Sequence, residues 1–291
     1  ALTGNDLISE DDAIVPVTAA APAAEPDVWI NILDPQEEQP DAQINILDPV
    51  EAGAPDAGIN ETIVDQASPL ILKTSGQTYQ LQTSLRFNGT GVYIAASNVT
   101  LDLNGHTIYY GGNDADNVRG VVLYLGWHNT EISISGASTP SNVRIINGSI
   151  VHEGTGDKSH GIYGYEARNV RIEDMRVESF GVDSHSVYFE EQNATILDSV
   201  LISHAHDSLN RHQGPANVRI GGTLIASGNV LIGGNSGFNI GSNSQITNNV
   251  IAHNSVVTNG YAIFTWYANN LLVKDNLILP SNGRGVILNS G

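Results

Sequence analysis

The sequence predicts an all-β solenoid of stacked coils that follows an extended N-terminal segment. Three observations lead to this prediction. Similar stretches begin at residues 141, 168, 193, 216, 243 and 269, so they return every 23 to 27 residues. Apolar residues alternate within each stretch, and Asn, Gly and Ser separate the alternating runs. Alternation with a period of two indicates strands, and a fixed repeat of this length indicates a solenoid.

Residues 1–68 form an acidic, Pro/Ala-rich extension without packing periodicity, as in "VPVTAAAPAAEP" and "PQEEQPDAQ". Within it the phrase "INILDP" occurs twice, at 30–35 and at 44–49. Each copy is a short β-prone run that Asp-Pro ends. Two interpretations stay open: a local duplication in a tether, or a pair of strands that dock on a sheet edge of this chain or of a neighbour.

The docking interpretation predicts assembly. Removing the apolar side chains of these two strands from water lowers the free energy. These side chains are Trp29, Ile30, Ile32, Leu33, Ile44, Ile46 and Leu47. We expect such a strand to complete the end of a neighbouring copy, which propagates head to tail because a heterologous contact need not close.

Residues 69–291 form the periodic part, with about seven coils expected from the repeat. Each coil carries about three short strands, with Val, Ile and Leu inward and Asn or Gly at corners that need left-handed backbone. The repeat stops within "GVILNSG" at 285–291. Two explanations stay open for this end: a natural chain that continues, or another subunit that covers it.

Composition narrows the classes of partner. The chain has 291 residues, no cysteine, and 12 Lys plus Arg against 31 Asp plus Glu, for a net charge of −19. This charge disfavours nucleic acid and anionic membranes as partners, and no apolar run is long enough to span a bilayer. An exported protein without disulfides is compatible with the absence of cysteine, and we expect an extracellular or cell-surface location.

The segment "GVYIAASNVTLDLNGHTI" at 91–108 resembles the opening coils of right-handed parallel β-helix proteins of the pectate-lyase-like superfamily. "NVRIEDMRVESFG" at 169–181 is similar to the generic repeat of such proteins, and "QTYQLQTSLRFNGTG" at 77–91 resembles their capping lead-in strand. The resemblance implies a right-handed parallel β-helix solenoid. It also implies a range of roles, from polysaccharide lyases, hydrolases and epimerases to structural solenoids.

Aligning the second run of each coil predicts the outward side chains. The residues taken as inward are Ile162, Val187, Leu209, Phe238, Ala262 and Val286. Acids, bases and a cation then gather in coils 157–213 as candidate catalytic residues: Asp183, His185, Glu190, Asp207, Arg211 and His212. Rings and an amide there are the candidate substrate-binding residues: His160, Tyr163, Tyr165, Tyr188 and Asn210. The alternative is that these side chains form only a solvated face.

We expect no cofactor and assign no metal ligand. His204 and His206 share a strand face with Asp207 close by, which is a weak zinc-like pattern without a third assigned ligand. "NDADN" at 113–117 is an acidic turn of a kind that holds calcium, and more often it is an ordinary turn.

Two classes of function therefore stay open. One is an extracellular protein that binds or degrades a polysaccharide along the 157–213 face, with tyrosine rings to stack on sugars and carboxylates or bases for chemistry. The other is a structural subunit of an extracellular fibre or surface layer, joined through its N-terminal strands. The sequence does not decide whether the protein is an enzyme.

Overall fold

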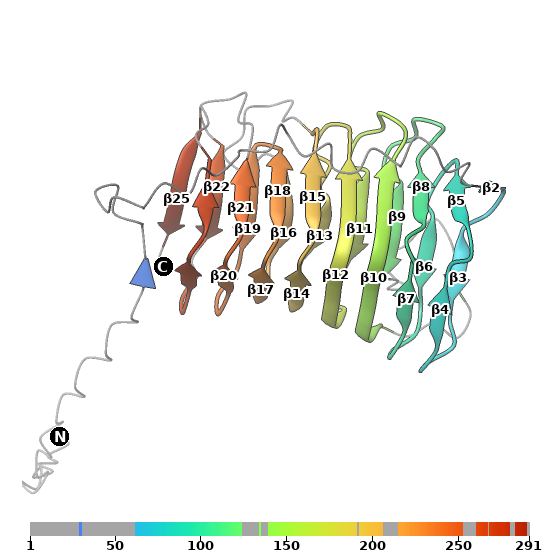
Figure 1. Ribbon diagram of the computed structural model, residues 1–291, viewed down its shortest axis with the longest axis horizontal. Helices are drawn as coiled ribbons and strands as arrows, with labels where there is room; N and C mark the ends of the chain where they lie inside the picture. Colours follow the sequence, from blue (N-terminus) through green and yellow to red (C-terminus); the bar gives the residue numbers. More distant parts are fainter. Residues whose placement is uncertain are drawn as a thin grey trace, which may run out of the picture.

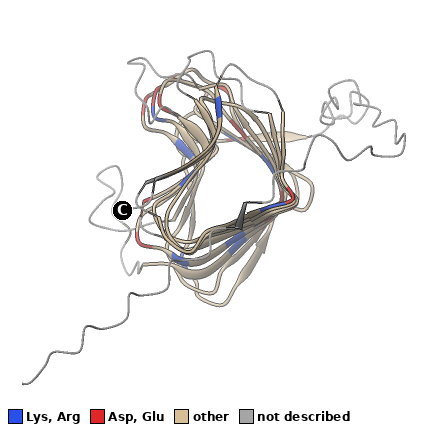
Figure 2. Ribbon diagram, turned by 90° about the vertical axis from the view of Figure 1, so that its left-hand side faces the viewer, with Lys and Arg blue, Asp and Glu red and all other residues tan. Residues whose placement is uncertain are grey.

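The computed structural model describes residues 29–30, 62–123, 134, 139–190, 192–205, 215–252, 260–266, 268–279 and 283–289. Its strands form two parallel sheets, a 16-stranded sheet A and a 9-stranded sheet B. The sheets run side by side along the solenoid (Figure 1), and in the view along its axis the coils superimpose on one closed outline (Figure 2). The expected all-β parallel β-helix is confirmed.

Each coil has a first strand and a second strand in sheet A and a third strand in sheet B. The first strands are β4 (Thr78–Gln80), β7 (Thr100–Asp102), the first halves of β10 (Ser141–His152) and β12 (Arg168–Ser179), β14 (Ala194–Leu197), β17 (Leu224–Ser227), β20 (Gln245–Thr247) and β23 (Leu272–Lys274). The second strands are β2 (Ile63–Gln66), β5 (Ser84–Phe87), β8 (Thr107–Tyr110), the second halves of β10 and β12, β15 (Val200–Ser203), β18 (Val230–Gly233), β21 (Val250–Ala252) and β24 (Leu277–Ile278). The third strands are β3 (Leu70–Leu72), β6 (Val92–Ile94), β9 (Arg119–Leu123), β11 (His160–Gly164), β13 (Val187–Phe189), β16 (Ala216–Ile220), β19 (Ser236–Ile240), β22 (Tyr261–Trp266) and β25 (Arg284–Asn289).

Two details of the coils differ from the sequence expectation. The described strands make eight coils of three strands, where the repeat suggested about seven, and β2 with β3 adds a partial coil that begins at Ile63. The run at 216–220 is β16, the third strand of its coil, and the next coil begins at Leu224. The phrase Asn-Val-Arg-Ile occurs in both first and third strands, so the phrase alone does not fix its position in a coil.

Inward side chains form continuous apolar rows because register partners in successive coils carry the same kind of residue. One row through the first strands is Leu101, Ile145, Ile172, Ile196, Ala226, Ile246 and Val273. All of these are buried in one core cluster that runs through the solenoid. Burial of such side chains contributes about 1.5–3 kcal/mol each, so the rows are the main source of stability.

Asparagine makes the corners, as expected. Asn98, Asn142 and Asn169 each have a positive φ, between 53° and 57°. Their side chains also form a chain of hydrogen bonds, in which Asn169 donates to Asn142 and Asn142 donates to Asn98, each at 3.0 Å. Asparagine tolerates left-handed backbone better than most residues, and its amide is both donor and acceptor.

A second asparagine ladder is buried between the first and second strands. The Asn249 Oδ1 atom accepts hydrogen bonds from the backbone N–H of Asn229 at 3.0 Å and from its side-chain amide at 2.9 Å. The Asn249 amide donates to the Ala226 carbonyl at 3.1 Å. Asn276 repeats the pattern one coil further on, since its Oδ1 accepts from Asn249. The ladder thus satisfies backbone groups that the bend between strands leaves without a sheet partner.

The β1 strand (Trp29–Ile30) pairs in parallel with β23, Trp29 opposite Leu272 and Ile30 opposite Val273. The first "INILDP" phrase thus begins at the last edge of sheet A of its own chain, where Figure 1 shows β1 near the C-terminus. The second phrase lies outside the described residues. No helix in the described part of the chain is long and apolar enough to cross a membrane.

We predict that Asn249→Ala lowers the free energy of unfolding by about 2–4 kcal/mol, because it leaves several buried polar groups of the ladder without partners. Gln245→Ala, at an exposed position of β20, serves as control and is expected to change it by less than about 0.5 kcal/mol. Urea denaturation followed by circular dichroism measures both. Equal effects of the two substitutions would contradict the structural role of the ladder.

Candidate functional site

The outer face of sheet B carries the candidate site. Register partners there form one outward row through the third strands: Val122, Tyr163, Tyr188, Arg219, Asn239, Phe264 and Ile287. Successive members lie about 4.8 Å apart, the spacing of paired strands. A chain molecule lying along the solenoid axis would therefore meet one member of the row per coil.

The His160 ring lies beside this row because Gly161 interrupts the strict alternation of β11. A Cβ atom at Gly161 would lie 2.3 Å from the Val177 side chain and 2.6 Å from the Ser186 carbonyl oxygen, so this position faces the interior and admits no side chain. His160 therefore projects outward, as Tyr163 does. The rings of His160 and Tyr163 stack with centroids 5.6 Å apart.

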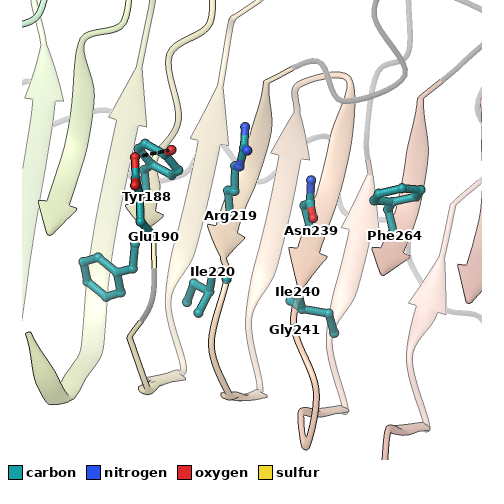
Figure 3. A pocket seen from close by; sticks show the side chains of 10 residues that line it. Tyr188, Glu190, Arg219, Ile220, Asn239, Ile240, Gly241 and Phe264 are labelled. Carbon is teal, nitrogen blue, oxygen red and sulfur yellow. Dashed lines mark hydrogen bonds between the residues drawn. The ribbon is translucent and has the colours of Figure 1, made fainter. Parts of the chain in front are cut away.

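An open depression of about 420 Å³ lies on this face, and we call it the sheet B groove. Tyr188, Glu190, Arg219, Asn239 and Phe264 line it, with the strand ends at Gly221 and Gly241. Figure 3 shows the side chains of Tyr188, Glu190, Arg219 and Asn239 along one side of the sheet. The groove thus crosses four coils, from β13 to β22.

Glycine keeps this groove open. A Cβ atom at Gly221 would lie 1.8 Å from the Glu190 carbonyl oxygen, and one at Gly241 would lie 2.3 Å from the Gly221 carbonyl oxygen. Both contacts are with backbone, which cannot move aside cheaply. The backbones of successive coils therefore approach closely at Gly221 and Gly241, and these two positions add no side chain to the groove.

The groove contains a cation, Arg219, that has no counter-ion among the described residues. The guanidinium of Arg219 lies 5.3 Å from the centre of the Tyr188 ring, and no described carboxylate forms an ion pair with it. The Tyr188 hydroxyl donates a hydrogen bond to Glu190 at 2.9 Å. Burial raises the pKa of Tyr188, Arg219 opposes this rise, and the bond to Glu190 adds to it. Tyr188 therefore stays protonated, with Glu190 as its acceptor.

His185, expected as an exposed catalytic residue, is buried, and so is His160, expected as a substrate-binding residue. His160 and His185 are each 5% exposed, with ring centroids 5.2 Å apart. Burial lowers the pKa of both, that of His185 to about 4. The Nδ1 atom of His160 accepts the backbone N–H of His185 at 3.2 Å, which leaves its proton on Nε2. The expectation failed because rings of neighbouring strands cover these side chains: His160 packs against Tyr163 and Tyr188, and His185 packs against Tyr188.

These histidines support the tyrosine rings. The His160 ring lies 4.9 Å from the Tyr188 ring, and the His185 ring lies 5.1 Å from it. The Nδ1 atom of His185 also lies 2.8 Å from the carbonyl oxygen of Ala216, and this contact fixes the His185 ring. The pair therefore packs against the rings of Tyr163 and Tyr188 and helps to position them.

The other predicted site residues divide into two groups. Asp183 is half-buried in the turn before β13 with a φ of 54°, and Tyr165 is half-buried just after β11. Four residues lie outside the described part of the chain: Asp207, Asn210, Arg211 and His212. Of the predicted set, the structure brings together His160, Tyr163, His185, Tyr188 and Glu190.

Sequence reasoning missed Arg219 and Phe264. It took Leu209 as the inward residue of its coil, whereas the sheet B strand of that coil is β16, with Val218 inward and Arg219 outward. In β22 it took Ala262 as inward, whereas Ile263 aligns with the inward Phe238. The alternation of Val218 and Ile220 around Arg219 was the available signal.

Residues considered for metal binding have other partners. The Nε2 atom of His204 lies 2.8 Å from a Glu178 carboxylate oxygen, and His206 lies outside the described residues. In the acidic turn, Asp114 accepts the backbone N–H of Thr155 at 2.8 Å and Asp116 accepts that of Asp157 at 2.8 Å. No group of three or more His, Asp or Glu among the described residues is arranged to hold a metal ion.

No protein-family model matches the chain, and no curated protein matches it. A solved structure similar to it is the A-module of the mannuronan C-5 epimerase AlgE4 of Azotobacter vinelandii. The sequence identity is 14%, the TM-score is 0.24, and the match covers 79% of this chain and 87% of that one. A likeness at this level assigns no activity to this chain, and its β-helix architecture follows from the strand pairing.

The buried His185 predicts a pH dependence of stability. Its pKa is about 4 in the folded protein and about 6.5 in an unfolded chain. As the pH falls the unfolded chain takes up the proton first. The stability from this group is therefore full above about pH 6.5 and falls by up to about 3 kcal/mol as the pH approaches 4.

His185→Asn keeps a polar group near the Nδ1 position but does not titrate. We expect the loss in free energy of unfolding between about pH 7 and about pH 4.5 to be smaller in this variant than in the unmodified protein. Urea denaturation at a series of pH values measures it. Identical pH profiles would contradict burial of a neutral His185.

Proposed function

We propose that the sheet B groove binds an acidic polysaccharide, with the sugar chain lying along the solenoid axis. The observation that carries the proposal is the Arg219 guanidinium, which faces an open groove beside the Tyr188 ring without a described counter-ion. A planar guanidinium matches the two oxygens of a carboxylate, so a uronate unit is the sugar class that it fits best.

The rest of the groove supports a sugar ligand. Tyr188 lines the groove and is only half-buried, so the exposed part of its ring can contact a sugar ring. Glu190 and Asn239 border the same groove and supply an acceptor and an amide for hydroxyl groups. Because the buried histidines hold the tyrosine rings in place, little conformational entropy is lost when a ligand binds.

The proposal is for binding rather than cleavage. Hydrolysis of a glycosidic bond uses two carboxyl groups about 5–9.5 Å apart, and Glu190 is the carboxylate among the described residues that line the groove. The neutral, buried His160 and His185 are poorly placed to take a proton from a bound sugar. The catalytic roles assigned to Asp207, Arg211 and His212 stay predictions.

A ligand of this class is consistent with an extracellular or cell-surface site of action, and we include that location in the proposal. The net charge of −19 repels a polyanion at long range. The attraction from Arg219 is local, so binding of an acidic polysaccharide should depend on this side chain and weaken as salt is added.

The proposal predicts that Arg219→Ala weakens binding of a polyuronate by at least about tenfold, a loss of about 1.4 kcal/mol. Arg219→Lys should weaken it less, because the charge remains while the planar fork is lost. Arg144→Ala is the matched control, since Arg144 lies on sheet A in an ion pair with Glu173 at 3.3 Å.

Isothermal titration calorimetry with polygalacturonate, polymannuronate and a neutral glucan measures these affinities. We expect binding to at least one polyuronate, weaker binding to the glucan, and an affinity of the Arg144→Ala variant within about twofold of the unmodified protein. Absence of polyuronate binding, or equal binding by the Arg219→Ala variant, would contradict the proposal.

A further inference from the structure

The two ends of the solenoid are complementary in their strands. At the C-terminal end β1 extends only the row of first strands, while β24 and β25 are the last described second and third strands. At the N-terminal end β2 and β3 extend the rows of second and third strands, while β4 is the first described first strand. Among the described strands, the C-terminal end therefore has one extra first strand. The N-terminal end has the second and third strands of a coil and lacks only its first strand.

We propose that copies of this chain stack head to tail, with β1 of one copy and β2 and β3 of the next forming one shared coil. In this arrangement β1 pairs with β23 of its own copy and with β4 of the next. The strands β24 and β25 then pair with β2 and β3 of the next copy. All coil-to-coil pairings among the described strands are parallel, and a head-to-tail stack preserves that direction, whereas a two-fold arrangement of the same ends would not.

Two of the inward rows would continue through such a contact without a polar residue. The register places Ile278 in the row that begins with Val64, and Val286 in the row that begins with Leu70. Both of these pairs would therefore be apolar.

Among the described residues, apolar side chains of the core are exposed or only partly buried at both ends. Val64 aligns with the buried Leu85 and so occupies an inward position, yet it is 39% exposed. Most of the residues packed on the core but only partly buried lie in the terminal strands: Leu70, Tyr79, Ile278, Val286 and Leu288. A second copy would bury these side chains and would satisfy the edge N–H and C=O groups at the same time.

The position of β1 is compatible with the length of the chain. From β1 to β2 the strand order of sheet A has nine steps, or about 43 Å at about 4.8 Å per step. The residues between Ile30 and Ile63 can reach farther than this at about 3.3 Å per residue. The contact between copies is heterologous, so it need not close and can propagate into a filament.

The test compares two substitutions at equally exposed aliphatic residues. Val64→Glu places a charge in the proposed contact between copies, where it would be buried without a partner. Ile225→Glu places the same charge on the lateral face of sheet A, where Ile225 is 42% exposed. Ile30→Pro is a third variant. It disturbs the pairing of β1 with β23 and leaves unchanged the solenoid end that β2, β3 and β4 form.

Sedimentation velocity over a wide concentration range gives the mass of each variant, and circular dichroism checks that each is folded. We expect the full chain and the Ile225→Glu variant to associate as concentration rises. The Val64→Glu and Ile30→Pro variants should need at least about tenfold higher concentration to do so. A full chain that stays monomeric, a folded Val64→Glu variant that associates normally, or equal loss in the Ile225→Glu variant would overturn the proposal.

Discussion

Parallel backbone pairing between coils is the constraint on which the rest of the structure depends. Strands inside the stack take their hydrogen-bond partners from the coils before and after them, so their residues have fixed register partners. Side chains far apart in the sequence are thereby aligned in rows about 4.8 Å apart. The same constraint makes the interior a set of apolar rows, and it explains why the corners need asparagine and glycine.

The proposed functions use these rows in two directions. Across the lateral face of sheet B, the row through Tyr188, Arg219 and Asn239 gathers a ring, a cation and an amide from three coils. Along the axis, the inward rows end in exposed apolar residues such as Val64. We propose that strands of a second copy pair with the chain at these ends. A groove on a lateral face and a contact at the ends do not compete, so a stack of copies would present repeated grooves to one long polymer.

Much of this architecture can be predicted from sequence because period, alternation and corner residues are local signals. The register of Tyr163 with Tyr188 followed directly from them. Arg219 was missed because "NVRI" serves equally as a first or a third strand, and only the strand pairing decides which. The burial of His160 and His185 was missed because it depends on rings from neighbouring strands that pack on them, and only the strand pairing brings these rings together.

The register in sheet B is the central claim, and disulfide cross-linking tests it directly because the chain has no cysteine of its own. Register partners lie about 4.8 Å apart, within the range of about 4.4–6.8 Å that a disulfide needs between Cα atoms. The double variant Tyr188→Cys/Arg219→Cys should therefore cross-link on mild oxidation, detected by mass spectrometry under non-reducing conditions. Tyr188→Cys/Asn239→Cys, two coils apart, should not. Cross-linking of the second pair but not of the first would contradict the account.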